Sequence, residues 1–466
     1  MLAATRKAFT TIPNVASKAT YATASQAVQI STAQNGIKVA TVEDAGQTAG
    51  LSIIVNGGAR LENGSNAGVA HFLKNYGFKN NANRTAFRIA REAELSGAVL
   101  SSNLTHESIV YSAEFLAADA EHCAELLGDV VSNQKFQDHE FIDVAKQTGA
   151  EATNAWSTPE VLAIEAAHQV AFRSGLGNSI FARPSSKVNN AAVKAFAAES
   201  FTSGNIALVG SGLDLETVQR LASYIQVPTG QSTTGASKYF GGESRVDQGA
   251  GAGHYVLAFE GAAANSSEFA ATQVLQYALG GAQQVKFAPA SGLLGQTAAK
   301  LAEGTQIKAF NFGYSDAGLF GVYITGASTE ATSSAVAAAA EQLKAVANGL
   351  SAEDFQRAVA QAKFAAAASF ATRLDRLETV GTQVSAEENE NDGKDNHWNT
   401  VFTNPNFSYQ AIQSGKYTSA SDFAASLDSL SVADVAKVAQ QVLKSKATAV
   451  AVGDVYNLPY ADSISL

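Results

Sequence analysis

The sequence predicts an α+β protein made of two homologous domains, each a mostly antiparallel sheet packed by helices. Three observations support this class. Apolar alternation and short apolar runs, typical of strands, occur between segments with helical periodicity. The order of these segments in the first half recurs in the second. A Gly/Ser/Thr-rich stretch separates the halves, and a chain of 466 residues exceeds what one hydrophobic core usually supports.

The first repeated unit is a strand followed by two helices. In residues 108–152 an alternating strand leads into an apolar-periodic helix, a short polar link at 133–138 and a longer helix. Residues 319–367 contain the same parts in the same order, with the link at 348–353. Ser351, with Asp354 three residues later, is a typical helix N-cap in the second copy.

The second repeated unit is a capped helix followed by a strand, and it closes each half. It occupies 188–212 and 430–454, where the strands run into Gly210 and Gly453 and Ser431 is the expected N-cap of the second helix. These repeats predict domains at 28–225 and 254–460. The intervening stretch 226–253 is too rich in Gly, Ser and Thr to build a core, and we expect a linker there.

The N-terminus has the composition of a targeting segment. Residues 1–42 contain no Asp or Glu but include Arg6, Lys7 and Lys18 among many Ala, Ser and Thr. A basic, Ser-rich and acid-free start is typical of a mitochondrial transit peptide. We therefore assign residues 1–20 to such a peptide.

Composition and the absence of known motifs argue against several classes of function. The formal net charge of −10 opposes a nucleic-acid partner. No apolar run approaches the ~18 residues of a membrane-spanning helix, so membrane association would depend on partner proteins. The single cysteine, Cys123, lies in an apolar-periodic run and is expected to be a buried thiol, which leaves no disulfide or CxxC metal site. No P-loop, dinucleotide fingerprint or GxSxG elbow occurs, and no cofactor is predicted.

The segment that would carry chemistry is HFLKN (71–75), inside a predicted helix that follows Gly68 and precedes ELSGAVL (94–100). It resembles the His-x-x-Glu-His helix of the inverted zinc metallopeptidases of the pitrilysin and mitochondrial processing-peptidase family. In that motif two histidines four residues apart share a helix face and bind Zn²⁺, while the glutamate activates the metal-bound water. The resemblance implies the family's fold, of the LuxS-like metallohydrolase type.

This sequence departs from the motif at two of its three positions. His71 matches the first histidine, but Lys74 stands in the place of the catalytic glutamate and Asn75 in the place of the second histidine. Glu151 lies at about the separation of the family's distal glutamate ligand. An ammonium repels Zn²⁺ rather than activating its water. We therefore predict no catalytic and no metal-binding residues: the four positions are vestigial, and Glu107 is assigned no catalytic role.

The segment AFNFGYSDAGLFGVYITG (309–326) resembles a strand–turn–strand of the family's non-catalytic subunits in the respiratory ubiquinol–cytochrome c reductase, complex III. Ser315, Asp316 and Gly318 predict a tight turn between two strands. The resemblance covers about residues 28–460. It implies an inactive structural subunit on the matrix side of the mitochondrial inner membrane, attached through partners. Those partners would be the homologous core subunit 1 and other complex III subunits, in a dimeric complex.

Two alternatives belong to another functional class. The substrate-binding α subunit of the matrix processing peptidase has also lost its zinc motif, but it carries a glycine-dense loop. The comparable segment here, 279–301, has separated glycines and no run of four or five, which disfavours that role. A zinc peptidase with an unorthodox ligand set is the other alternative, and Lys74 and Asn75 disfavour it.

Overall fold

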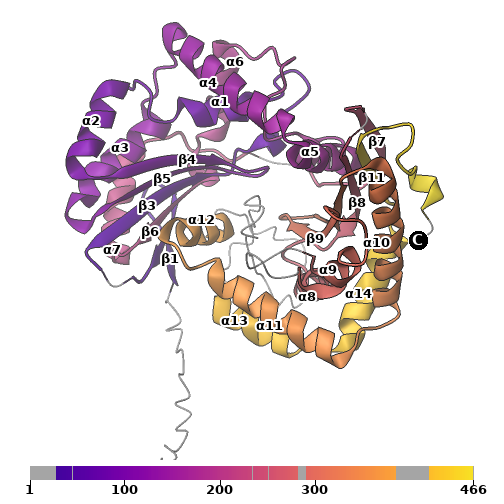
Figure 1. Ribbon diagram of the computed structural model, residues 1–466. Helices are drawn as coiled ribbons and strands as arrows, with labels where there is room; N and C mark the ends of the chain where they lie inside the picture. The colour runs from indigo at the N-terminus through magenta and orange to yellow at the C-terminus, as the bar shows by residue number, and fades with distance from the viewer. Residues whose placement is uncertain are drawn as a thin grey trace, which may run out of the picture.

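The computed structural model describes residues 28–44, 46–232, 235–249, 251–281, 290–384 and 419–464. The predicted transit peptide at 1–20 lies outside these ranges. Each half of the chain contains one sheet with helices packed on it, so the predicted α+β class is confirmed (Figure 1).

The first sheet has the strand order β1-β2-β6-β3-β5-β4. Its neighbours pair antiparallel except β2 with β6, which are parallel. Its strands are β1 (Val28–Thr32), β2 (Lys38–Val42), β3 (Thr48–Val55), β4 (Val99–Leu104), β5 (Ile109–Leu116) and β6 (Ile206–Ser211).

The second sheet has the order β7-β11-β8-β10-β9, antiparallel except for the parallel pair β7 and β11. Its strands are β7 (Gly242–Asp247), β8 (Gly253–Gly261), β9 (Gln306–Gly313), β10 (Gly318–Gly326) and β11 (Thr448–Gly453). The two orders correspond strand by strand: β2, β6, β3, β5 and β4 occupy the same places in the first sheet as β7, β11, β8, β10 and β9 in the second. The duplication predicted from the sequence is therefore present in the sheet topology.

The helices predicted by the repeats, within 108–152, 188–212, 319–367 and 430–454, are all present. The helices of the first half are α1 (Val69–Tyr76), α2 (Ala86–Ser96), α3 (Ala120–Ser132), α4 (Asp138–Ser157), α5 (Pro159–Phe172), α6 (Asn190–Ser200) and α7 (Leu215–Leu221). In the second they are α8 (Phe269–Leu279), α9 (Gly292–Ala298), α10 (Thr329–Ala347), α11 (Ala352–Ala368), α12 (Arg373–Val384), α13 (Ala420–Asp428) and α14 (Val432–Lys444). Ser351 caps α11, and Ser431 forms a capping box with Asp434 at the start of α14.

One segment differs from its prediction. Strand β7 lies inside the stretch 226–253 that we expected to be a linker. Its sequence, GESRVD, is mostly polar, as expected for an edge strand with only one hydrogen-bonded neighbour among the described strands, β11. An edge strand needs no continuous apolar run, so apolar periodicity does not reveal it.

Both sheets are covered on two faces because each half lends a helix to the other. Strands β6 and β11 are buried along their whole length. Helix α5, from the first half, packs on β8 and β11 of the second sheet through an apolar cluster that includes Ala167, Phe172 and Val450. Helix α12, from the second half, packs on β2, β3 and β6 of the first sheet (Figure 1). This exchange joins the two halves into one packed unit.

The remaining structural predictions concern Cys123 and the membrane. Cys123 is fully buried in the core of the first half, as predicted. Burial raises the pKa of its thiol to about 12. Across the described ranges, no helix combines the length and the hydropathy needed to cross a bilayer.

Candidate functional site

Helix α1 carries the HFLKN segment and begins at a tightly packed glycine. Gly68 has φ 91°, and a Cβ at this position would lie 2.9 Å from Ala182. The buried Glu62 carboxylate accepts hydrogen bonds from the Gly68 and Ala70 backbone N–H groups at 2.7 and 2.8 Å. Burial raises the pKa of Glu62 to about 8. Glu62 thus fixes the start of α1, and sequence periodicity did not identify it because it lies outside the helix.

His71 is buried and held at both ring nitrogens. The backbone N–H of Ala182 donates to Nδ1 at 3.2 Å. Nε2 therefore carries the proton and donates to Oε2 of Glu151 at 2.8 Å. The histidine is a neutral donor that links α1 to a carboxylate on α4.

Lys74 and Asn75 contact the same carboxylate oxygen. Nζ of Lys74 lies 2.8 Å from Oε2 of Glu151 and forms an ion pair with it. Nδ2 of Asn75 donates to Oε2 at 3.2 Å and to Oγ1 of Thr148 at 2.9 Å. Gln147 donates to the other oxygen, Oε1, at 3.0 Å.

The structure therefore brings His71, Lys74, Asn75 and Glu151 together. The hydrogen bond from His71, followed by those from Lys74 and Gln147, holds the pKa of Glu151 well below its ordinary value. The carboxylate is a charged acceptor whose lone pairs are occupied by protein donors. Gln147 and Thr148 were missed from the sequence, although their spacing of four and three residues from Glu151 on one helix could have indicated contact.

A second polar cluster joins the two halves. Arg60 donates to Oε1 of Glu107 and to Oδ2 of Asp316, both at 2.6 Å, and to Oγ of Ser315 at 2.8 Å. The side chains of Arg60 and Glu107 are 5% and 1% exposed. Ser315 and Asp316 lie in the turn between β9 and β10, as predicted. No sequence pattern indicated that this turn also contacts the first half.

Buried titratable groups continue beside this cluster. The rings of His106 and His168 stack with their centroids 4.6 Å apart, and His168 Nε2 lies 2.7 Å from the hydroxyl of Tyr314. Burial lowers the pKa of His168 to about 4 and raises that of Glu165 to about 7. These side chains are below 5% exposed, so the cluster is part of the packed interior between the halves.

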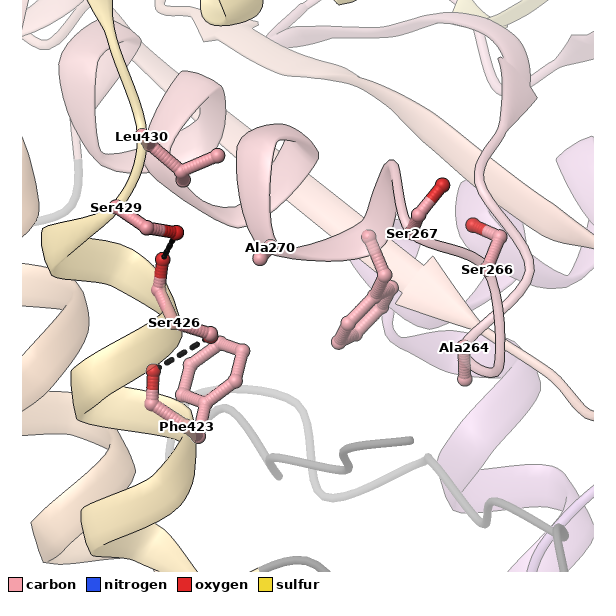
Figure 2. Close-up of a pocket in the computed structure, with 9 residues that line it drawn as sticks. Ala264, Ser266, Ser267, Ala270, Phe423, Ser426, Ser429 and Leu430 are labelled. Atoms are coloured by element: carbon pink, nitrogen blue, oxygen red, sulfur yellow. Dashed lines mark hydrogen bonds between the residues drawn. The ribbon is translucent and has the colours of Figure 1, made fainter. Parts of the chain in front are cut away.

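The small pocket in Figure 2 offers no alternative centre. It has a volume of about 50 Å³, room for one or two waters, and lies between the start of α8 and the end of α13. Ser426 and Ser429 donate their hydroxyls to backbone carbonyls of Phe423 and Ser426 at 2.7 Å. None of its lining residues is His, Cys, Asp, Glu or Lys. In the described ranges no three His, Cys, Asp or Glu side chains are grouped as a metal site.

Comparison with known proteins gives the family. Residues 38–184 match the model "Insulinase (Peptidase family M16)", and residues 187–362 match "Peptidase M16 inactive domain". The chain is 34% identical to the cytochrome b-c1 complex subunit 2, mitochondrial, of Cryptococcus neoformans, over 93% of this chain and 94% of the relative. It is 34% identical to that of Neurospora crassa (92% and 90% covered) and 28% identical to the human protein (92% and 90%). Together with the duplicated sheets and the converging motif positions, these matches show that the chain belongs to peptidase family M16.

Proposed function

We propose that this protein is a non-catalytic, structural core subunit of mitochondrial complex III that supports electron transfer from ubiquinol to cytochrome c by holding the assembly together. The observation that carries the proposal is the ion pair between Lys74 and Glu151 in the place of a catalytic centre. The three relatives reported above are each named subunit 2 of the cytochrome b-c1 complex, which supports the same assignment.

The residues at the motif do not fit a hydrolytic zinc centre. Such a centre needs three protein ligands, an open position for water and a general base. Here His71 and Glu151 are bonded directly to each other, and the ammonium of Lys74 occupies the side of the carboxylate that a cation would take. Asn75 supplies an amide donor to the carboxylate instead of an imidazole. No residue of this cluster is placed to act as a base on a bound water.

In this proposal the subunit lies on the matrix side of the inner membrane and is peripheral to it. It pairs with the homologous core subunit 1 and contacts other complex III subunits, within a dimeric complex. It needs no cofactor of its own. The domain limits at 28–225 and 254–460 and the transit peptide at 1–20 belong to the same proposal.

The test is native gel electrophoresis of mild-detergent extracts of mitochondria, followed by mass spectrometry of each band. The proposal expects this chain to co-migrate with the cytochrome b and cytochrome c₁ subunits in stoichiometric amount. Co-migration with a presequence-cleaving peptidase in place of complex III would overturn it. That result would favour the alternative, a substrate-binding α subunit. The segment of this chain that corresponds to the α subunit's glycine-dense loop is 279–301. Of this segment, 282–289 lie outside the described ranges, and Gly292 and Gly295 belong to α9.

A further inference from the structure

We infer that the outer edge of β7 is a docking site for an extended segment of a partner subunit, with apolar side chains at alternate positions and at least one carboxylate. The inference rests on the proposed function, because it takes the partner from within complex III. It identifies a specific surface that neither the family match nor the vestigial motif assigns.

The internal duplication indicates what this edge is built to hold. Strand β7 occupies the place in the second sheet that β2 occupies in the first. In the first sheet β1 pairs antiparallel with β2 along the full five residues, from Val28 opposite Val42 to Thr32 opposite Lys38. In the second sheet no described strand pairs with the corresponding side of β7. The second sheet therefore lacks, within the described ranges, a strand that its twin possesses.

The backbone of β7 has hydrogen-bonding groups directed to this side. The N–H groups of Gly242 and Gln248 donate to Ala447 and Gly453 of the neighbouring strand region, each at 3.1 Å. In a parallel ladder, the backbone N–H and C=O groups of every second residue face the same neighbouring strand, and those of the residues between them face the other side. The backbone groups of Glu243, Arg245 and Asp247 consequently point away from β11. Within the described ranges they have no backbone partner.

The C-terminal segment does not take this position. It is bound through a side chain of β7: Arg245 donates to the carbonyl oxygens of Val455 at 3.0 Å and of Leu458 at 2.8 Å. The guanidinium also lies 3.9 Å from the ring centroid of Tyr460. Because side chains alternate along a strand, the side chain of Arg245 points to one face of the sheet and those of Ser244 and Val246 point to the other. The segment therefore packs on one face and leaves the edge accessible.

A groove lies on the other face, directly beside this edge. It has a volume of about 410 Å³ and is lined by Ser244 and Val246 of β7, by Leu162 and Ala166 of α5 and by Trp156 at the end of α4. Figure 1 shows α5 next to the outer margin of the second sheet, where β7 lies. A strand added to β7 would direct every second side chain into this groove. The apolar walls favour apolar side chains at those positions.

The charge at the rim selects an acidic segment. Arg183 lines both this groove and an adjoining cavity of about 110 Å³, which is also lined by Arg173. Arg173 and Lys238 lie over the ring of Phe240, 4.1 and 5.5 Å from its centroid, just before β7 begins. None of these three cations forms an ion pair with a described residue. In a chain of net charge −10, such a group of unpaired cations is complementary to a carboxylate.

The test uses the full chain in mitochondria, with the photo-crosslinker p-benzoylphenylalanine placed at Ser244. Complex III is isolated after irradiation, and cross-linked peptides are identified by mass spectrometry. We expect one cross-linked segment, from another subunit, with alternate apolar residues and an acidic residue. Because α4 and α5 of the same chain also line this groove, cross-links to their residues are the expected background. A cross-link to a second copy of this chain, or no cross-link to another subunit in an assembled complex, would each overturn the inference.

Substitutions make the test specific. Arg183→Glu and Ala166→Phe, which change the charge and the volume of the groove, are each expected to lower the cross-link yield by about tenfold. Lys437→Glu and Ala433→Phe are matched controls on the exposed side of α14 and should leave the yield unchanged. Equal yields from groove variants and controls would contradict the inference.

Hydrogen exchange provides a second measurement without substitutions. The amides of Glu243, Arg245 and Asp247 are expected to exchange at least about tenfold more slowly in complex III than in the isolated chain. Those of Ser244 and Val246, directed to β11, should change little. Unchanged exchange at the outward amides refutes the docking site. A chain that never enters complex III refutes the proposed function instead, so the two failures are distinguishable.

Discussion

Restoring the family's ligands at the start of α1 is expected to create a zinc site that the natural chain does not have. The perturbation is the double substitution Lys74→Glu with Asn75→His. It removes the ammonium that lies 2.8 Å from Oε2 of Glu151 and supplies a carboxylate and a second imidazole. Nε2 of His71 on α1 already lies 2.8 Å from Oε2 of Glu151 on α4. With an imidazole at position 75, three ligands would meet at one point.

The structure sets the size of the effect. Without metal, the variant places a second carboxylate beside Glu151 and loses its ion pair. Because the Glu151 side chain is 34% exposed, water screens this repulsion. We expect a cost of about 1–2 kcal/mol in the free energy of unfolding, at the low end for charges about 4 Å apart. Zinc at about 100 times its dissociation constant should then stabilise the variant by about 2.7 kcal/mol.

The assay is urea unfolding with and without zinc, combined with the zinc content of the protein after dialysis. The variant should retain about one zinc per chain and unfold at higher urea when zinc is present. The control Lys74→Met with Asn75→Ala removes the ammonium without adding ligands and should gain neither property. The reasoning is wrong if zinc stabilises the natural chain or the control as much as the variant.

Two further substitutions test the buried charges between the halves. Arg60→Met leaves the buried Glu107 without its cation and should lower the free energy of unfolding by about 3–5 kcal/mol. Adding Glu107→Gln should recover part of this loss. A loss below about 1 kcal/mol in urea unfolding would contradict this prediction. Burial raises the pKa of Glu165 from its ordinary value of 4.5 to about 7, so the folded chain holds this proton as pH rises while the unfolded chain releases it. The free energy of unfolding should therefore fall as the pH rises from about 4.5 to about 7 and stay low at higher pH. Glu165→Gln should remove that slope and stabilise the protein at pH 8 by up to about 3 kcal/mol; an unchanged slope would refute the assignment.

Sequence patterns predicted the features that depend on neighbours along the chain. The two repeats, their N-caps at Ser351 and Ser431 and the helix around His71 are all local, and the structure confirms them. The resemblance also placed Glu151 at about the separation of the family's distal ligand, and in the structure its helix, α4, packs against α1. Local propensity and periodicity carry this information because each element is largely decided by its own residues.

The features that were missed depend on contacts between distant segments. The pairing of Arg60 with Asp316 joins residues far apart in sequence, and neither has a pattern that reveals the other. An apolar stripe on α5 or α12 shows that the helix buries one face, but not that the face lies on the opposite half's sheet. Strand β7 has a polar sequence because its edge position requires little burial.

The most direct test of the central claim is depletion of this chain from mitochondria, followed by re-expression of the natural chain or of a variant carrying His71→Ala and Glu151→Gln. Complex III assembly, ubiquinol–cytochrome c reductase activity and cleavage of imported presequences are measured together. Depletion should abolish assembly and reductase activity while presequence cleavage continues, and both re-expressed chains should restore assembly. Loss of presequence cleavage with complex III intact, or failure of the variant to restore function despite normal folding, would contradict the account.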